Sequence, residues 1–362
     1  MTVWDLYPPD YCARQVQFIL RAIQAGECVS IVGLSGSGKS NLLGYLAQRG
    51  DSLGSIYPLR LVDCNRLPDF TPGAFFHQAR HALDDDQPAS DEWTALEAVV
   101  GRFLSERSSL GLLLDRFDAM AEYAGPAFYS NLRALRDAHK YSLVYVAATR
   151  RPLQPHSELS ELFYANTIWM GPLSESDARW SITRFAARKN LAWGEDTLQA
   201  LLQVTRGYPS FLRAACEACA DGAPLDPASL LKHPAVARRV EEFWSDHPGE
   251  ADLRNSGLAG HPLLSATQTA AMPPIQAGDA SLTAKESLLW GYLLDHPNQV
   301  CEKDDLIRAV WPEDRIYDQG IRDDSLAQLV RRLREKVEVN PSVPQLVLTI
   351  PGRGYRYLPP VD

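Results

Sequence analysis

Residues 28–40, CVSIVGLSGSGKS, limit the possible folds of this chain more than any other segment. A short β-branched apolar run ends at Gly33, a turn rich in glycine and serine follows, and Lys39 and Ser40 open an apolar helical pattern. Together with Gly38, these residues satisfy the spacing G-x-x-x-x-G-K-[ST]. Such a loop turns its backbone N–H groups inward, and the next helix adds the partial positive charge of its N-terminus. The sequence therefore predicts a strand, a phosphate-binding loop and a helix, in that order.

The residue types in this loop indicate which ligand it binds. Lys39 would reach the β- and γ-phosphates of a nucleotide, and the Ser40 hydroxyl would be a ligand of Mg²⁺. We therefore expect ATP and Mg²⁺ as cofactors. The alternative is a surface turn that happens to contain a lysine, and the flanking strand and helix patterns disfavour it. The expected phosphate-binding residues are Gly33, Ser35, Gly36, Ser37, Gly38, Lys39, Ser40 and Asn41.

A second apolar run, residues 110–114, ends in Asp115, and Asp118 follows shortly after it. In an open α/β sheet, ligands bind at the carboxyl ends of the strands. We therefore expect Asp115 to hold Mg²⁺ together with Ser40, and Asp118 to orient the attacking water. With Lys39, these two carboxylates are the candidate catalytic residues. The alternative for Asp115 is an ordinary carboxylate in the turn after a strand.

A third buried strand pattern, residues 142–147, is followed by Thr149 and Arg150. A polar side chain at such a strand end can sense a γ-phosphate, so we expect one of these two to do so, with ordinary surface charge as the alternative. Strand patterns that alternate with helical patterns predict a doubly wound α/β domain with a parallel sheet. The expected strands are residues 28–32, 56–62, 110–114, 142–147 and 166–169.

The chain is expected to have four parts. Residues 1–170 would form the nucleotide-binding core, and residues 171–245, which have several helical patterns, a small helical lid. Residues 246–280 contain four prolines and four glycines, which predicts a flexible linker. Residues 281–362 have patterns for three helices and a terminal hairpin, which predicts an α+β winged-helix domain.

The order of the N-terminal motifs resembles a known protein class. The phosphate loop, the Asp115 and Thr149 strand ends, and the turn Gly207-Tyr208-Pro209 follow one another as in STAND signal-transduction ATPases, which are close to the initiator-type AAA+ ATPases. The resemblance implies a P-loop NTPase core whose lid moves with nucleotide state. It also implies that Pro209 touches the adenine and that Arg206 or Arg213 approaches the phosphates.

The chain departs from that resemblance at two positions. Arg116 follows Asp115, where AAA+ proteins have an acidic residue, and Ala119 follows Asp118, where STAND proteins often have glutamate. Both departures predict slow hydrolysis, so the expected activity is that of a weak ATPase used as a switch.

The C-terminal domain has a resemblance of its own. It resembles the DNA-binding domain of OmpR/PhoB-type regulators over nearly all of residues 281–362, which implies double-stranded DNA as a partner. The motifs that carry the resemblance are Leu282-Thr283, Lys285-Glu286, Leu288-Leu289, Leu306, Val310-Trp311, Arg332-Leu333-Arg334, Lys336, Thr349-Ile350, Gly352 and Gly354-Tyr355-Arg356.

Helical periodicity selects a candidate DNA-reading face on the third helix of this domain, which is expected from Asp324 to about Val337. Its leucines and valines fall on one face. The opposite face carries Gln328, Arg331 and Arg332, which we expect to enter the major groove. From the wing, Arg353 and Arg356 are expected to reach phosphate or the minor groove. The alternative is a solvated charged face.

Net charge favours a different interpretation of the same domain. The whole chain carries −9, and residues 281–362 contain 11 Lys and Arg against 13 Asp and Glu. Since phosphate neutralisation supplies most non-specific DNA affinity, one copy would bind weakly unless its basic residues cluster or several copies act together. We therefore expect self-association. We also keep a second function open, in which the winged helix mediates protein–protein assembly in a signalling or defence ATPase and does not bind DNA.

Composition and patterning indicate the compartment. Six cysteines are scattered through the chain, and neither a signal peptide nor an apolar run near 18 residues is found. We therefore expect a cytoplasmic protein without membrane contact. The leading expectation is an ATP-dependent transcriptional regulator that responds to an unidentified protein signal.

Overall fold

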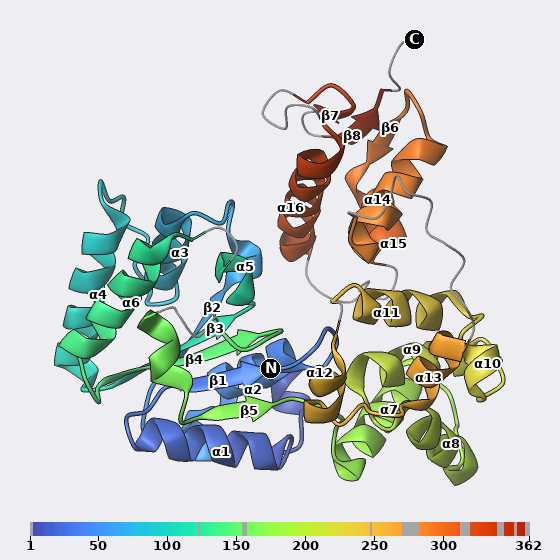
Figure 1. Ribbon diagram of the computed structural model, residues 1–362, viewed down its shortest axis with the longest axis horizontal. Coiled ribbons are helices and arrows are strands. Elements are labelled where there is room, and N and C mark those ends of the chain that lie inside the picture. The colour runs from blue at the N-terminus through green and yellow to red at the C-terminus, as the bar shows by residue number, and fades with distance from the viewer. Residues whose placement is uncertain are drawn as a thin grey trace. The chain divides into compact units, whose positions relative to one another are not determined.

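The computed structural model describes residues 3–121, 124–153, 158–246, 248–269, 282–311, 319–338, 344–350 and 353–358. The chain divides into two compact units, Met1–Thr269 and Ala270–Asp362 (Figure 1). The first unit contains a parallel sheet with its helices and a separate helical cluster, and the second unit is a small α+β domain.

The first unit is built on a five-stranded parallel sheet with the order β2-β3-β4-β1-β5. This sheet confirms the predicted α/β fold class. The second strand begins later than the expected residue 56, directly after Pro58, which has no N–H to donate to a sheet. The strands are β1 (Val29–Val32), β2 (Leu59–Asp63), β3 (Leu110–Asp115), β4 (Leu143–Thr149) and β5 (Thr167–Trp169).

Burial explains why these strands could be recognised in the sequence. Every residue of β1, β3 and β4 is buried, so these strands have nearly continuous apolar runs, broken within β1 by Ser30, and no alternation. The register pairs Asp63 at the end of β2 with Asp115 at the end of β3. Two neighbouring strands therefore deliver carboxylates to the same edge of the sheet.

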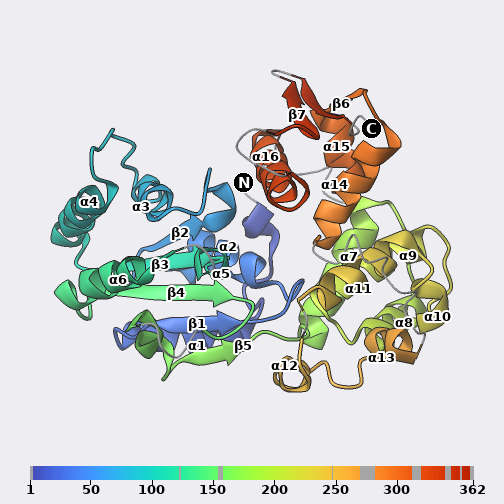
Figure 2. The ribbon, with the colours of Figure 1, turned by 45° about the horizontal axis from the view of Figure 1, so that its top comes forward.

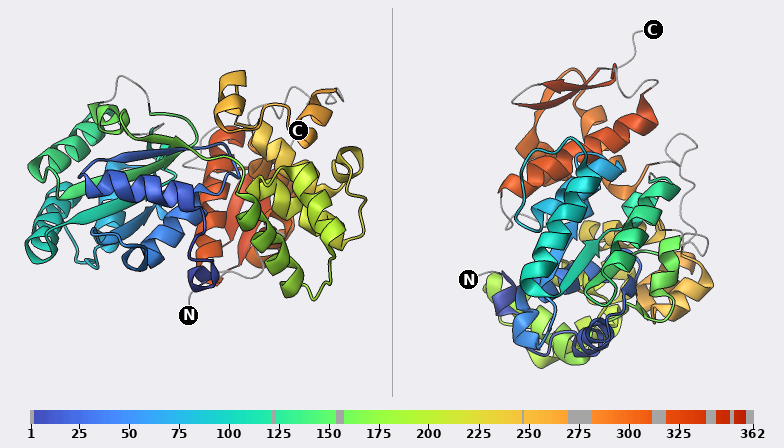
Figure 3. Two further views of the ribbon diagram at one scale, coloured as in Figure 1. Left: turned by 90° about the horizontal axis from the view of Figure 1, so that it is seen from below. Right: turned by 90° about the vertical axis from the view of Figure 1, so that its left-hand side faces the viewer.

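Helices pack around the sheet and complete its core (Figure 3). The buried face of α1 (Val16, Ile19, Leu20 and Ile23) packs in that core, as the amphipathic pattern of this helix requires. The α-helices are α1 (Ala13–Gln24), α2 (Lys39–Arg49), α3 (Pro72–His81), α4 (Glu92–Arg107), α5 (Asp118–Ala121) and α6 (Pro126–Ala138). The short 3-10 helices are η1 (Val3–Leu6), η2 (Asp51–Leu53), η3 (Cys64–Arg66) and η4 (Glu158–Phe163).

A helical cluster follows the sheet along the chain and has its own apolar core, which includes Tyr208, Phe211 and Phe243. The Ser174 side chain caps its first helix by accepting the N–H of Asp177 at 3.1 Å. The arrowheads of β4 and β5 point toward this cluster (Figure 2). Its helices are α7 (Glu175–Arg188), α8 (Glu195–Thr205), α9 (Pro209–Ala220), α10 (Pro227–Leu230), α11 (Pro234–Trp244), α12 (Glu250–Asn255) and α13 (Pro262–Thr269).

The last two of these helices correct the expected linker. Residues 250–269 were expected to be flexible because of their prolines and glycines, but they form α12 and α13. Leu258, Leu263 and Leu264 are buried in the core of the helical cluster. Pro262 stands at the start of its helix, where a missing N–H is harmless, so the proline content did not exclude a helix. The expected linker residues 270–280 lie outside the described residues.

The second unit is a winged helix, as the sequence predicted. Three helices pack on an antiparallel sheet with the order β6-β8-β7, around a core of their own. Thr283 and Glu286 form a capping box at the first helix. The elements are α14 (Ala284–Asp295), β6 (Val300–Glu302), α15 (Lys303–Val310), α16 (Gln319–Val337), β7 (Val347–Ile350) and β8 (Gly354–Tyr357).

Two details of this unit differ from the sequence prediction. The predicted terminal hairpin has a third strand beside it, because β6 pairs with β8. A Cβ at Gly354 would lie 2.0 Å from the Cys301 carbonyl oxygen, so this close pairing requires glycine. The third helix begins at Gln319 and not at Asp324.

Candidate nucleotide-binding site

The loop between β1 and α2 has the backbone geometry of an anion-binding turn. Gly36 and Gly38 adopt left-handed φ values of 79° and 89°, which glycine reaches without strain. Gly38 is also the N-cap of α2, so the unpaired N–H groups of that helix begin at the loop. The predicted strand, loop and helix are therefore present in the predicted order.

Lys39 lies at the head of α2 and folds back over this loop. Its amine donates to the Gly33 carbonyl and, at 3.4 Å, to the Leu34 carbonyl. Burial lowers the pKa of Lys39 to about 8, although the charges of Asp118, Asp115 and Asp246 act to raise it. The loop therefore holds a poorly solvated cation whose hydrogen-bond partners are neutral oxygen atoms of the loop, two carbonyls and the Ser37 hydroxyl.

Ser40 and Asp115 meet at the head of the same helix. The N–H of Arg116 donates to Asp115 Oδ1 at 2.9 Å. Burial raises the pKa of the Asp115 carboxyl, and the neighbouring Ser40 hydroxyl, as a hydrogen-bonding group, opposes that shift. No group of three or more His, Cys, Asp or Glu that could hold a metal occurs among the described residues. One carboxylate beside one hydroxyl suits Mg²⁺, which keeps several waters and takes phosphate oxygens as ligands.

Asp118 and Arg150 form an ion pair near this site. Arg150 Nε lies 3.3 Å from Asp118 Oδ2, and Arg150 Nη1 lies 3.2 Å from Asp246 Oδ1. The structure thus brings the end of β4 close to the turn after β3, as expected for residues at one sheet edge. It also adds Asp246, which the sequence had assigned to a linker.

Thr149, the other candidate sensor, is fully buried and lies behind the loop. Its carbonyl accepts the N–H of Gly33 at 3.1 Å, and its hydroxyl has no hydrogen-bond partner among the residues that the structure describes. Arg150, in contrast, is 44% exposed at the mouth of the site. Of the two candidates, Arg150 is therefore the better placed to meet a ligand.

The turn before α9 packs directly on the phosphate loop. The Tyr208 hydroxyl donates to the Ser35 carbonyl at 2.8 Å, and the Ser210 N–H donates to the Gly36 carbonyl at 3.1 Å. A Cβ at Gly38 would lie 3.5 Å from Pro209 Cγ, which places Pro209 at the loop. Helical patterning gave no signal for these contacts of Tyr208 and Ser210, since they join residues far apart in the chain.

Three further residues that were expected near the phosphates are Asn41, Ser37 and Arg206. Asn41 is exposed in the first turn of α2, and the Ser37 side chain is buried in the loop. Arg206, expected near the phosphates, donates to the Ala259 carbonyl at 3.1 Å inside the helical cluster. The left-handed glycines, the cation and the Ser40–Asp115 pair together fit a nucleoside triphosphate with Mg²⁺.

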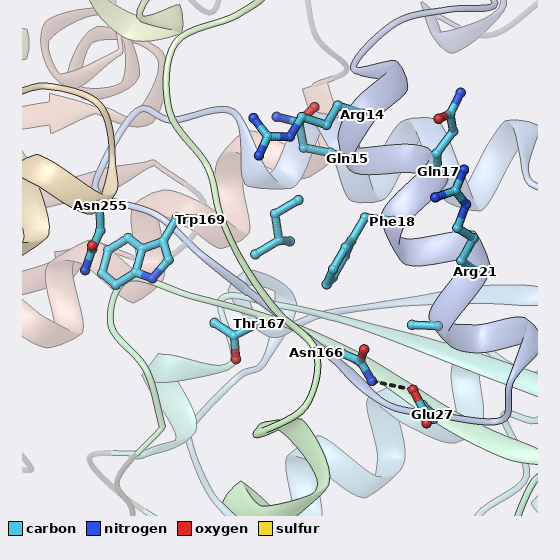
Figure 4. A pocket seen from close by; sticks show the side chains of 12 residues that line it. Arg14, Gln15, Gln17, Phe18, Arg21, Glu27, Asn166, Thr167, Trp169 and Asn255 are labelled. Atoms are coloured by element: carbon cyan, nitrogen blue, oxygen red, sulfur yellow. Dashed lines mark hydrogen bonds between the residues drawn. The ribbon is translucent and has the colours of Figure 1, made fainter.

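A separate hollow of about 890 Å³ lies beside the edge strand β5 (Figure 4). Arg14, Phe18 and Arg21 of α1 line one side, and Trp169 lines another. No predicted site residue lines this hollow, so it is distinct from the phosphate loop.

The candidate DNA-binding residues lie in the second unit. The apolar face of α16 is buried as predicted, through Leu326, Leu329, Val330 and Leu333. Arg331, in contrast, is exposed, while Gln328 and Arg332 are half-buried.

In the wing, Arg353 pairs with Glu302, with Nε 3.0 Å from Oε1, and Arg356 is half-buried in β8. A third basic residue, Arg334, joins α16 to the hairpin by donating to the Val347 carbonyl at 2.7 Å. Arg353 and Arg334 are therefore both engaged by groups of the domain itself.

Two protein families match the chain, one in each of its two compact units. The family described as "Novel STAND NTPase 1" matches residues 12–213, which is more than half of the chain. The family described as "Transcriptional regulatory protein, C terminal" matches residues 277–357.

Curated relatives match in the C-terminal region. The transcriptional regulatory protein YvrH of Bacillus subtilis is 35% identical over 86 residues, which cover 24% of this chain and 35% of YvrH. AfsQ1 of Streptomyces coelicolor is 40% identical over 82 residues, which cover 23% of this chain and 35% of AfsQ1. The chain thus spans about a third of the length of these relatives.

Solved structures resemble the chain more distantly. The Walker-type ATPase PABY2304 of Pyrococcus abyssi has a TM-score of 0.47 at 12% identity, covering 98% of this chain and 97% of that one. The Aeropyrum pernix ORC1 protein in complex with DNA has a TM-score of 0.46 at 12% identity, covering 98% and 90%.

Within the described part of the chain, no helix is both long and apolar enough to cross a membrane. The sheet order, the phosphate loop and the family match over residues 12–213 agree with one another. The chain therefore belongs to the novel STAND NTPase 1 family and carries a C-terminal domain of the OmpR/PhoB-type transcriptional regulatory family.

Proposed function

We propose that this protein is an ATP-binding switch that controls DNA binding by its winged helix, and that it acts as a transcriptional regulator. The observation that supports this most is the contact between the helical cluster and the phosphate loop, Tyr208 to Ser35 at 2.8 Å. Because the same loop would hold the phosphates, a nucleotide there changes what the helical cluster can contact.

The proposed roles follow the geometry. The loop from Gly33 to Asn41 and the Lys39 amine hold the phosphates, while Ser40 and Asp115 hold Mg²⁺. Bound Mg²⁺ neutralises phosphate charge and polarises the terminal phosphate. Asp118 orients water, Arg150 senses the γ-phosphate, and Pro209 contacts the adenine. Arg116 and Ala119 leave no carboxylate at the positions next to Asp115 and Asp118, so we expect slow turnover.

The proposed domains are a core of residues 1–170, a lid that extends from residue 171 to 269, and the winged helix from 281. For DNA, we propose that Gln328, Arg331 and Arg332 enter the major groove and that Arg353 and Arg356 contact the backbone. Self-association would multiply weak individual contacts into useful avidity.

A second candidate function has an observation of its own in its favour. Arg353 pairs with Glu302 and Arg334 binds within the hairpin, in a domain whose acidic residues already outnumber its basic ones. Both arginines are therefore partly occupied by the domain itself. This favours a winged helix that mediates protein–protein assembly.

Salt-dependent retention on double-stranded DNA distinguishes the two functions. We expect the full chain with ATP to be retained at low salt, and Arg331→Ala to weaken retention by about tenfold. Arg308→Ala is the matched control, because it removes an exposed arginine from α15, where Asp305 already pairs with it. If the full chain is not retained at low salt, or if both variants weaken equally, the assembly function is favoured.

A further inference from the structure

A lid carboxylate lies at the phosphate loop. Asp246 lies in the turn after α11, beyond the residues that match the NTPase family. Its side chain is only 3% exposed. Its Oδ2 accepts the backbone N–H of Ser35 at 2.7 Å, and its Oδ1 lies 3.2 Å from Arg150 Nη1. One carboxylate therefore joins the lid, the loop and the end of β4.

A hydrogen bond to the backbone carbonyl of Asp246 also helps to hold this residue in place. Arg151 Nη2 donates to the Asp246 carbonyl at 2.7 Å, and Phe243, shortly before it, is buried in the lid core. A buried carboxylate is stable only where donors or cations compensate it. Here Ser35 and Arg150 supply that compensation.

Both partners of Asp246 belong to the proposed nucleotide site. The Ser35 N–H is one of the loop donors, and Arg150 is the proposed sensor of the γ-phosphate. The negative charge of Asp246 also acts to raise the pKa of Lys39. A terminal phosphate would need these same donors and would carry the same sign of charge, so the two anions exclude each other.

We infer that Asp246 determines nucleotide specificity, by acting as an anion carried on the lid that competes with the terminal phosphate of a nucleoside triphosphate. The inference rests on the proposed nucleotide binding. When a nucleoside diphosphate is bound, Asp246 keeps its contacts with Ser35 and Arg150, and the lid stays in contact with the loop. A triphosphate must displace the carboxylate, and this displacement releases the lid. Asp246 thus lowers the preference of the site for ATP over ADP.

The test compares two affinities in the full chain. Dissociation constants for a non-hydrolysable ATP analogue and for ADP, each with Mg²⁺, are measured by calorimetry in the wild type and in Asp246→Asn. We expect the variant to bind the ATP analogue about tenfold more tightly and ADP within about twofold of the wild type, because removal of one close like charge is worth about one decade.

Asp196→Asn is the matched control, since it removes the same charge from an exposed position on α8, and it should change neither affinity. If Asp246→Asn does not fold, as judged by circular dichroism, Asp246→Ser answers the same question. An unchanged ratio of the two affinities, or an equal loss of both, would show that Asp246 only holds the lid against the loop. Either result would overturn the inference. If neither nucleotide binds the folded wild type or the variant, the proposed nucleotide binding itself is wrong, and the inference is overturned with it.

Discussion

Two opposing effects act on the pKa of Lys39. Desolvation lowers its pKa to about 8, while three nearby carboxylates act to raise it. A bound polyanion would favour the charged form further. The lysine is therefore a cation whose protonation depends on ligand binding near physiological pH.

This shift predicts how nucleotide affinity depends on pH. Above about pH 8 the free protein has increasingly neutral Lys39, so that binding must take up a proton and the affinity for ATP falls. The dissociation constant should rise by up to about tenfold per pH unit. Lys39→Arg, whose side chain stays charged, should remove this dependence. Titrations between about pH 7 and pH 10 check it, and identical pH profiles for both proteins would argue against the assigned role.

Asp115 leads to a prediction about Mg²⁺. Its buried carboxylate lies next to the Ser40 hydroxyl, so Asp115→Asn removes a charge from the proposed metal site while keeping the side-chain shape. We expect ATP affinity with Mg²⁺ to fall about tenfold and affinity in the presence of a chelator to stay unchanged or improve. Calorimetry with and without Mg²⁺ measures both. Equal affinities of variant and wild type in Mg²⁺ would remove Asp115 from the metal site.

Among the elements, α13 shows how far the helical cluster, the proposed lid, extends. Leu263 is fully buried in the core of that cluster, although its segment was expected to be a linker. Leu263→Ala should destabilise the lid by about 2–5 kcal/mol, which amide hydrogen exchange in α8 and α10 would report. Leu294→Ala, which truncates a leucine that is 43% exposed on α14, should leave those amides unchanged. Unchanged exchange in the Leu263 variant would show that α13 does not support the lid.

Sequence patterns predicted the elements whose signal is local. The runs that became β1, β3 and β4 are buried throughout, and the loop before α2 carries its chemistry in consecutive residues. The apolar face of α16 follows from its period alone. These features need no information from distant parts of the chain.

Long-range pairings were missed for a physical reason. Asp246 meets Ser35 across 211 positions of sequence, and β6 exists only because β8 pairs with it. Neither three residues of strand nor a single aspartate carries a pattern of its own. Asp246 also follows a helix in a stretch whose composition is typical of a linker, so no local pattern placed it near the loop.

Considered as one molecule, the chain contains a unit of the STAND NTPase family and a domain of the transcriptional regulatory type. Nucleotide state would reach the rest of the chain through the lid, because Tyr208, Ser210 and Asp246 all contact the loop. An effector changes the affinity at a second site only if it binds the two arrangements of the protein differently. Competition between Asp246 and a terminal phosphate would supply that difference.

The most direct test of this coupling is the affinity of the full chain for double-stranded DNA at fixed low salt. Fluorescence anisotropy with a labelled random-sequence duplex would compare a non-hydrolysable ATP analogue, ADP and no nucleotide, in the wild type and in Lys39→Ala. We predict that the ATP analogue and ADP give dissociation constants that differ by about fivefold or more in the wild type and coincide in Lys39→Ala. Equal DNA affinities in the wild type, with both nucleotides shown to be bound, would contradict the proposed switch.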